Sequence, residues 1–232
     1  MISCFQSDYK ECVLKADNMT MEVFCALTNS NVKFISSVRS FMEKVNRDSG
    51  MDLADIQKAL SYSIIIKNFA QISNSAFVRI QELLVFQINQ AFSKVKDYEK
   101  LNLEEFLTNT FKELFPIFDM LVSTYSKKLW SHIYVEFSRI FAKMIILLSS
   151  KYKTSKISDL TKKIENDKQL VMEIFGEKAS KKDKKLGDDI IESVYGVFTL
   201  PIDEIINSII VLRVQLGEVF NDKFMVKYKI KY

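Results

Sequence analysis

The sequence predicts an all-α protein made of tandem antiparallel helical bundles that form an elongated rod. The chain of 232 residues contains only five glycines and two prolines, whereas folds rich in strands need turn residues about every ten positions. Its hydrophobic fraction of 48% is enough for a substantial core and too high for general disorder. Amphipathic segments follow one another with short connections, which favours antiparallel neighbours in a bundle.

The first part of the chain is expected to form several helices. One or two helices cover 8–47 and end at "NRDSG", and the next follows Asp52, a good N-cap, over 53–70. A long helix then begins after "SNS" at 73–75. Its apolar stripe, spaced by three and four residues, consists of Phe77, Ile80, Leu84, Ile88 and Ala91.

A shorter helix is expected over 103–114. Pro116 fits the first turn of the next helix, where its missing N–H costs nothing, and that helix is expected to run past Met144. No change in composition and no internal repeat divides the sequence, so we interpret residues 1–232 as one helical region, an elongated or compact bundle. The expected subdivision is two consecutive bundles with a boundary near 150–156.

The last part of the chain predicts a helix over 156–176 that stops at Gly176, a candidate C-cap. Further helices are expected to begin at Asp188 and at Pro201.

Asp167 falls on the apolar seam of the helix over 156–176. A globular helix buries a broader stripe than a strict heptad, so Leu170 and Ile174 can shift the buried face away from Asp167, and we favour this interpretation. The alternative is a buried carboxylate paired with a lysine or arginine of a neighbouring helix, which would fix the register of the two helices.

The charges and cysteines exclude several classes of protein. The chain has 33 basic and 29 acidic residues, a net charge of +4, which is too mild to require nucleic acid as a partner. The cysteines, Cys4, Cys12 and Cys25, are odd in number and have no CxxC spacing. Neither a disulfide framework nor a zinc site is therefore expected, and a reducing cytosol suits them.

Membrane insertion is also not expected. The most apolar segment, "LWSHIYVEFSRIFAKMIILLSS", contains Glu136, Arg139 and Lys143, each of which would cost roughly 2.5–3.5 kcal/mol at the centre of a bilayer. Charged residues also interrupt the place where a signal peptide would have its apolar region. The expected location is the cytoplasm.

The sequence offers weak catalytic signals, and we expect no enzyme, no cofactor and no catalytic or metal-binding residue. The sole histidine, His132, is interpreted as a structural residue of a helix. Phosphate-binding, metalloprotease and nucleophile-elbow motifs are absent. Asp188, Asp189 and Glu192 match the acid-rich pattern of helical terpenoid synthases, which leaves a magnesium-dependent enzyme as an alternative, but a suitable second metal-binding helix is lacking. We interpret the two aspartates as caps of a helix start.

The lysine run from Glu177 to Lys185 carries a net charge of +3 and has no large apolar side chain. It is expected to be an exposed, mobile loop. Its residues are candidates for weak contact with an anionic membrane surface: Lys178, Lys181, Lys182, Lys184 and Lys185. A helical nucleic-acid-binding protein, which would use these lysines and the tail with Phe224, Tyr228 and Tyr232, is a further alternative.

Several segments in order resemble one family. They are "CALTNSNVKFISSVRSFMEKV", with Ala26, Asn29 and Phe34, then "KIENDKQLVMEIF", with Glu165 or Asp167 and Phe175, then "IIESVYGVFTL", and then "IINSIIVLRVQLGEVF", with Leu212 and Arg213. This order is similar to the C-terminal region of the exocyst complex component 3 family, which belongs to the class of tethering complexes containing helical rods. The family often continues with Gly-Asp after the arginine, whereas this chain reaches a glycine only at Gly217.

The resemblance implies a non-enzymatic subunit of the exocyst. Such a subunit helps to hold secretory vesicles at the plasma membrane before SNARE-mediated fusion. The implied partners are other exocyst subunits and SNARE proteins, and the implied location is peripheral, at the plasma membrane or on secretory vesicles.

Overall fold

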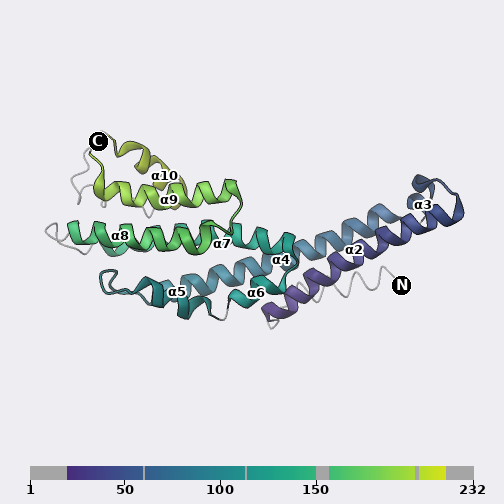
Figure 1. Cartoon of the computed structure of the whole chain (residues 1–232), viewed down its shortest axis with the longest axis horizontal. Coiled ribbons are helices and arrows are strands. Elements are labelled where there is room, and N and C mark those ends of the chain that lie inside the picture. The colour runs from purple at the N-terminus through teal and green to yellow at the C-terminus, as the bar shows by residue number, and fades with distance from the viewer. Residues whose placement is uncertain (1–19, 60, 113, 150–156, 202–203, 218–232) are drawn as a thin grey trace. The chain divides into compact units, whose positions relative to one another are not determined.

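The computed structural model in Figure 1 describes residues 20–217 except 60, 113, 150–156 and 202–203. Over these residues it contains nine α-helices, one π-helical turn and no strand, which confirms the all-α class. Its contacts divide the chain into two compact units. Unit 1 contains the described residues up to Leu83 together with Ile117–Tyr125, and unit 2 contains Leu84–Pro116 and the described residues from Ser126 onward.

Unit 1 is built on a helical hairpin. Its elements are α2 (Met21–Ser49), α3 (Leu53–Ala59) and the first part of α4 (Tyr62–Ser93). The rings of Phe34 and Phe69 lie 4.3 Å apart between α2 and α4. Gly50 ends α2 with a left-handed φ of 64°, at the place that "NRDSG" predicted. Asp52 accepts a hydrogen bond from the Ala54 N–H at 2.7 Å, as an N-cap does.

The predicted helix start after "SNS" is wrong, because α4 runs through this segment without a break. Ser73 is buried, and its hydroxyl lies 3.4 Å from the carbonyl oxygen of Thr28 and 3.1 Å from the hydroxyl of Tyr125. Asn74 accepts a hydrogen bond from Tyr125 at 2.9 Å. These polar side chains have tertiary partners and do not compete with the backbone, so the helix continues.

The predicted helix from Pro116 past Met144 is also divided. Pro116 lies in the first turn of α6 (Phe115–Met120), as expected, but a new helix, α7 (Ser123–Ser149), begins three residues after α6 ends. Asn29 of α2 stabilises this break. Its side chain donates to the carbonyl of Met120 at 2.6 Å and accepts from the N–H of Val122 at 3.0 Å.

Unit 2 has an aromatic core. Its elements are the end of α4, α5 (Leu103–Phe111), α7 from Ser126 on, α8 (Ile157–Val171), the π-helical turn η2 (Met172–Gly176), α9 (Lys181–Thr199) and α10 (Ile206–Leu216). The buried ring of Phe175 lies 4.8 Å from Phe137 and 5.1 Å from Phe111, between centroids. Trp130 and Tyr134 lie at 6.2 and 6.3 Å from it. The cluster joins α5, α7 and η2.

The helix predicted over 156–176 is confirmed in extent, but its last turn is π-helical. Gly176 is buried and has no left-handed φ, and the C-cap is Glu177, so Gly176 is not the predicted C-cap of the αL type. The expected bundle boundary near 150–156 lies outside the described residues. The parts of α7 and α8 described on either side of it belong to the same unit.

The last helix packs on α9. Its predicted start at Pro201 is wrong, because α10 begins at Ile206, after a turn in which Ile205 donates to the Pro201 carbonyl at 3.1 Å. The helices approach closely at Gly196, where an added Cβ would lie 2.6 Å from the hydroxyl oxygen of Ser208. Gly217 ends α10 with a φ of 57°, which places a turn at this glycine.

Candidate functional site

The lysine run lies mostly in a helix, so the loop predicted over 177–185 is wrong. Helix α9 begins at Lys181, and Ser180 is its N-cap. The predicted helix start at Asp188 is therefore wrong as well, since Asp188 lies inside α9. The sequence signal that was missed is the capping box in "SKKD", a serine followed three residues later by an acid.

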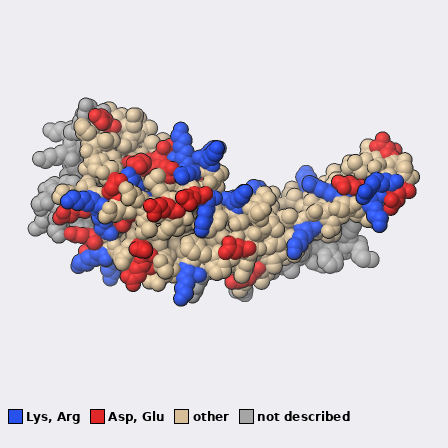
Figure 2. All heavy atoms as spheres, viewed as in Figure 1, with Lys and Arg blue, Asp and Glu red and all other residues tan. Residues whose placement is uncertain are grey.

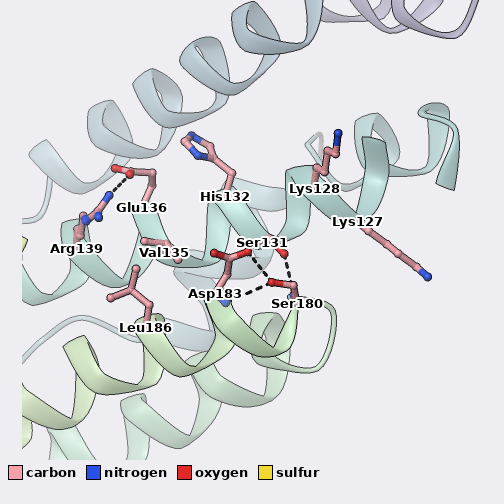
Figure 3. Close-up of a pocket in the computed structure, with 10 residues that line it drawn as sticks. All are labelled: Lys127, Lys128, Ser131, His132, Val135, Glu136, Arg139, Ser180, Asp183 and Leu186. Atoms are coloured by element: carbon pink, nitrogen blue, oxygen red, sulfur yellow. Dashed lines mark hydrogen bonds and ion pairs between the residues drawn. The ribbon is translucent and has the colours of Figure 1, made fainter. Parts of the chain in front are cut away.

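The cap is fixed to α7. The Ser180 side chain accepts from the Asp183 N–H at 3.3 Å and donates to the Asp183 carboxylate at 2.6 Å. The Ser180 N–H donates to the buried hydroxyl of Ser131 at 2.7 Å (Figure 3). The start of α9 is therefore fixed by hydrogen bonds within the helix, to Asp183, and by a hydrogen bond to Ser131 of α7.

The five candidate lysines separate into two kinds. Lys178 lies over the ring of Trp130, 4.1 Å from its centroid, and Lys184 is half-buried beside Gly176. Lys178 is exposed, and so are Lys181, Lys182 and Lys185. Cations in the first turn oppose the helix dipole, so helix stability does not explain Lys181 and Lys182.

A groove between α7 and the start of α9 adjoins this cap, with a volume of about 440 Å³ (Figure 3). Burial lowers the pKa of the half-buried His132, with Arg139 also lowering it and Glu136 and Asp183 opposing the shift. Arg139 pairs with Glu136 and donates to Gln215 of α10 at 2.9 and 3.2 Å. The groove is lined by Lys127, Lys128, Ser131, His132, Val135, Glu136, Arg139, Ser180, Asp183 and Leu186.

This groove has the character of a polar contact surface. Its two carboxylates are engaged, Glu136 with Arg139 and Asp183 with the helix cap. The Ser131 hydroxyl accepts the Ser180 N–H. Its charged residues are of both signs.

The three acids that the magnesium-dependent alternative would use, Asp188, Asp189 and Glu192, do not share a common partner. Asp188 accepts a hydrogen bond from Tyr134, whose pKa is raised by burial and by this hydrogen bond. Glu192 pairs with Lys168 of α8 at 3.1 Å, and Asp189 is exposed. Over the described residues, no group of three or more histidines, cysteines or carboxylates could hold a metal ion. In this arrangement Asp188 contacts α7 and Glu192 contacts α8.

Asp167 is buried, so the favoured interpretation, in which it turns away from the core, is wrong. It accepts a hydrogen bond from Tyr98 at 2.7 Å and pairs with Lys163 at 3.1 Å. The pairing cation is on its own helix, whereas the alternative expected one from a neighbouring helix. Tyr98 comes from the connection between α4 and α5, and Asp167 therefore links that connection to α8.

A second polar network joins α8 to α9 through Lys168. The Lys168 ammonium lies 3.1 Å from a carboxylate oxygen of both Glu165 and Glu192, and 4.5 Å from the ring centroid of Tyr195. Burial alone would lower the pKa of Lys168, but the hydrogen bonds to the two glutamates raise it overall. These contacts fix the register of α8 on α9.

The residues that carry the family resemblance differ in burial and in their contacts. Phe175 and Leu212 are completely buried, and Arg213 is exposed. Asn29 holds the break between α6 and α7. Phe34 is partly exposed at 42%.

The structure describes only some of the cysteines and of the residues that the nucleic-acid alternative would use. Cys25 is buried, and burial raises the pKa of its thiol to about 11, with a smaller contribution from Glu22. Cys4, Cys12 and the tail residues Phe224, Tyr228 and Tyr232 lie outside the described residues. Basic and acidic side chains are mixed on the face seen in Figure 2, which gives no support to the nucleic-acid alternative.

Comparison with protein-family models, curated proteins and solved structures gives no match to this chain. Among the described helices, none has the length and apolar character that crossing a membrane requires.

Proposed function

We propose that this chain is a non-enzymatic interaction protein and acts as a subunit of an exocyst-type tethering complex. Its helical surfaces would bind other exocyst subunits and SNARE proteins, and its tandem bundles would form part of a rod. The family resemblance supports the choice of complex. The observation that carries the general role is an exposed apolar stripe on α10.

Helix α10 has apolar side chains on both sides. Ile209 and Leu212 are buried on the side that packs against α9. The other side exposes Ile206, Ile210 and Val214, at 57%, 54% and 73%, with a spacing of four residues. Such a spacing forms one continuous stripe on a helix. An exposed apolar stripe of this kind is typical of a protein-binding surface.

The location that we propose is cytoplasmic, peripheral at the plasma membrane or on secretory vesicles. The exposed lysines Lys181, Lys182 and Lys185 could contact anionic lipid there. At about 1 kcal/mol for each basic residue near such a surface, three lysines supply roughly 3 kcal/mol. This is weaker than millimolar binding, so the lysines assist a protein-mediated attachment and do not replace it.

Affinity purification of the tagged chain from its own cells tests the proposal. Ile210→Asp places a charge in the middle of the stripe, and Leu147→Asp, on α7, is a control at a residue of similar exposure, 54% against 49%. The wild type and the control are expected to recover other helical-rod tethering subunits, and Ile210→Asp to lose them. Recovery of ribonucleoproteins, or of no tethering subunit with any of the three forms, would contradict the proposal.

A further inference from the structure

The described residues give the outer part of the hairpin in unit 1 two long helices and the short α3 from which to build a core. Near its base, Ile117–Tyr125 adds a third layer against Asn29 and Ser73. Across 32–71, by contrast, only Met42 and Ile56 are buried among the residues whose exposure is described. Helices of globular proteins obtain most of their stability from packing of an apolar face. Among the residues that the structure describes, the outer hairpin therefore leaves much of its apolar surface uncovered.

One side of this hairpin is apolar. Phe34, Val38, Phe41 and Val45 are spaced by four, three and four residues, so they share one side of α2. The contact between Phe34 and Phe69 shows that the same side continues onto α4. Ile65 lies one helical turn before Phe69 on that side. Phe41 is 58% exposed, and the valines are half-buried.

The charges near this apolar side are distributed so that two copies of the hairpin complement each other when they lie antiparallel. Residues 33–44 and 62–71 carry four basic residues and one acidic residue, a net +3, whereas residues 47–58 at the tip carry two basic and three acidic residues, a net −1. Two hairpins in antiparallel orientation would place each tip beside the basic part of the other. A parallel pair would place like charges together.

The size of the surface fits a reversible dimer. Residues 30–48 span about 28 Å of helix at 1.5 Å per residue. Two helices packed at their usual separation are about 20 Å wide. The two copies together would bury on the order of 1,100 Å², at the low end for specific complexes.

We infer that the apolar face formed by Phe34, Val38, Phe41, Val45, Ile65 and Phe69 binds the same face of a second copy of this chain. The two hairpins form an antiparallel four-helix bundle with two-fold symmetry, the commonest arrangement of a homodimer. This inference rests on the hairpin alone and is independent of the tethering proposal.

Sedimentation velocity of the full chain over a wide range of concentration tests the inference. The mass is expected to rise with concentration from the chain mass of 27.0 kDa to twice that value. Phe41→Glu is expected to keep the chain monomeric at every concentration, with helix content by circular dichroism unchanged. Since exposed charge pairs are screened by salt, added salt is expected to lower the dimer fraction of the wild type.

Ile64→Glu is the matched control. Ile64 is 59% exposed, close to Phe41, but it is one position from Ile65 and so is turned by about 100° around α4. This variant is expected to dimerise like the wild type. A wild-type chain that stays monomeric, or an equal loss of dimer in both variants, would overturn the inference. A dimer that strengthens with salt would overturn the antiparallel arrangement.

Discussion

Gly187 of α9 is a position where a single methyl group should destabilise unit 2. A Cβ at Gly187 would lie 2.5, 2.8 and 2.9 Å from three ring carbons of Tyr134. The Tyr134 side chain is completely buried, stacks on Phe175, and has its hydroxyl bound to Asp188. The ring therefore has no free direction in which to move away from the added methyl group.

The magnitude follows from two opposing effects. Replacing a helical glycine by alanine gains about 1 kcal/mol of helix propensity. Overpacking a well-filled core costs about 1–3 kcal/mol, and the upper end applies here because three contacts are below 3.0 Å. Gly187→Ala is therefore expected to lower the free energy of unfolding by about 2 kcal/mol. For a chain of this size, this corresponds to about 4–8 °C in Tm.

Urea unfolding of a double-mutant cycle measures the effect. Tyr134→Ala removes the ring and costs about 3–5 kcal/mol by itself, so all variants are compared in the same stabilising sulfate buffer. In that background the methyl group meets no ring, and Gly187→Ala is expected to stabilise by up to about 1 kcal/mol. Gly176→Ala is a control, since its nearest contact would be an ordinary 3.6 Å. A destabilisation by Gly187→Ala of the same size in both backgrounds would refute the role of Tyr134.

Three other variants test the polar contacts of unit 2. Tyr98→Phe leaves the buried Asp167 without a hydroxyl donor and is expected to cost about 1.5–3 kcal/mol in urea unfolding; no measurable loss would show that water replaces the donor. Ser180→Ala removes the cap of α9 and is expected to cost about 0.5–2 kcal/mol in the same assay, with Ser180→Asn restoring most of it. Burial lowers the pKa of His132 below its usual 6.5, so the unfolded chain takes up the proton first as the pH falls. The stability that neutral His132 contributes is present above pH 6.5 and is lost as the pH falls toward its lowered pKa, and His132→Gln should flatten that part of the stability profile.

The sequence predicted the helix content well, but only some of the helix ends. The scarcity of glycine and proline indicated an all-α chain, and the caps at Gly50 and Asp52 are local signals that the structure confirms. The end of one helix at Gly176 was also correct, although this glycine has no left-handed φ.

Errors arose where a distant partner decides the local structure. The break between α6 and α7 depends on Asn29, which is more than ninety positions away in the chain. The continuity of α4 through Ser73 depends on Thr28 and Tyr125. No window of neighbouring residues contains such information.

The start of α9 is a different kind of error. The capping box of Ser180 and Asp183 was present in the sequence, but the density of lysines was interpreted as a solvated loop. The burial of Asp167 could not have been predicted with confidence from spacing, because its partner Tyr98 lies 69 positions away.

We propose that the chain works as one subunit of a tethering assembly. The most direct measurement is size fractionation of an extract from its own cells, followed by quantitative mass spectrometry of each fraction. We expect most of the chain to elute well above twice its mass of 27.0 kDa, together with other helical-rod tethering subunits in constant proportion. Elution of the chain only at the mass of a monomer or a dimer, or together with ribonucleoproteins, would contradict it.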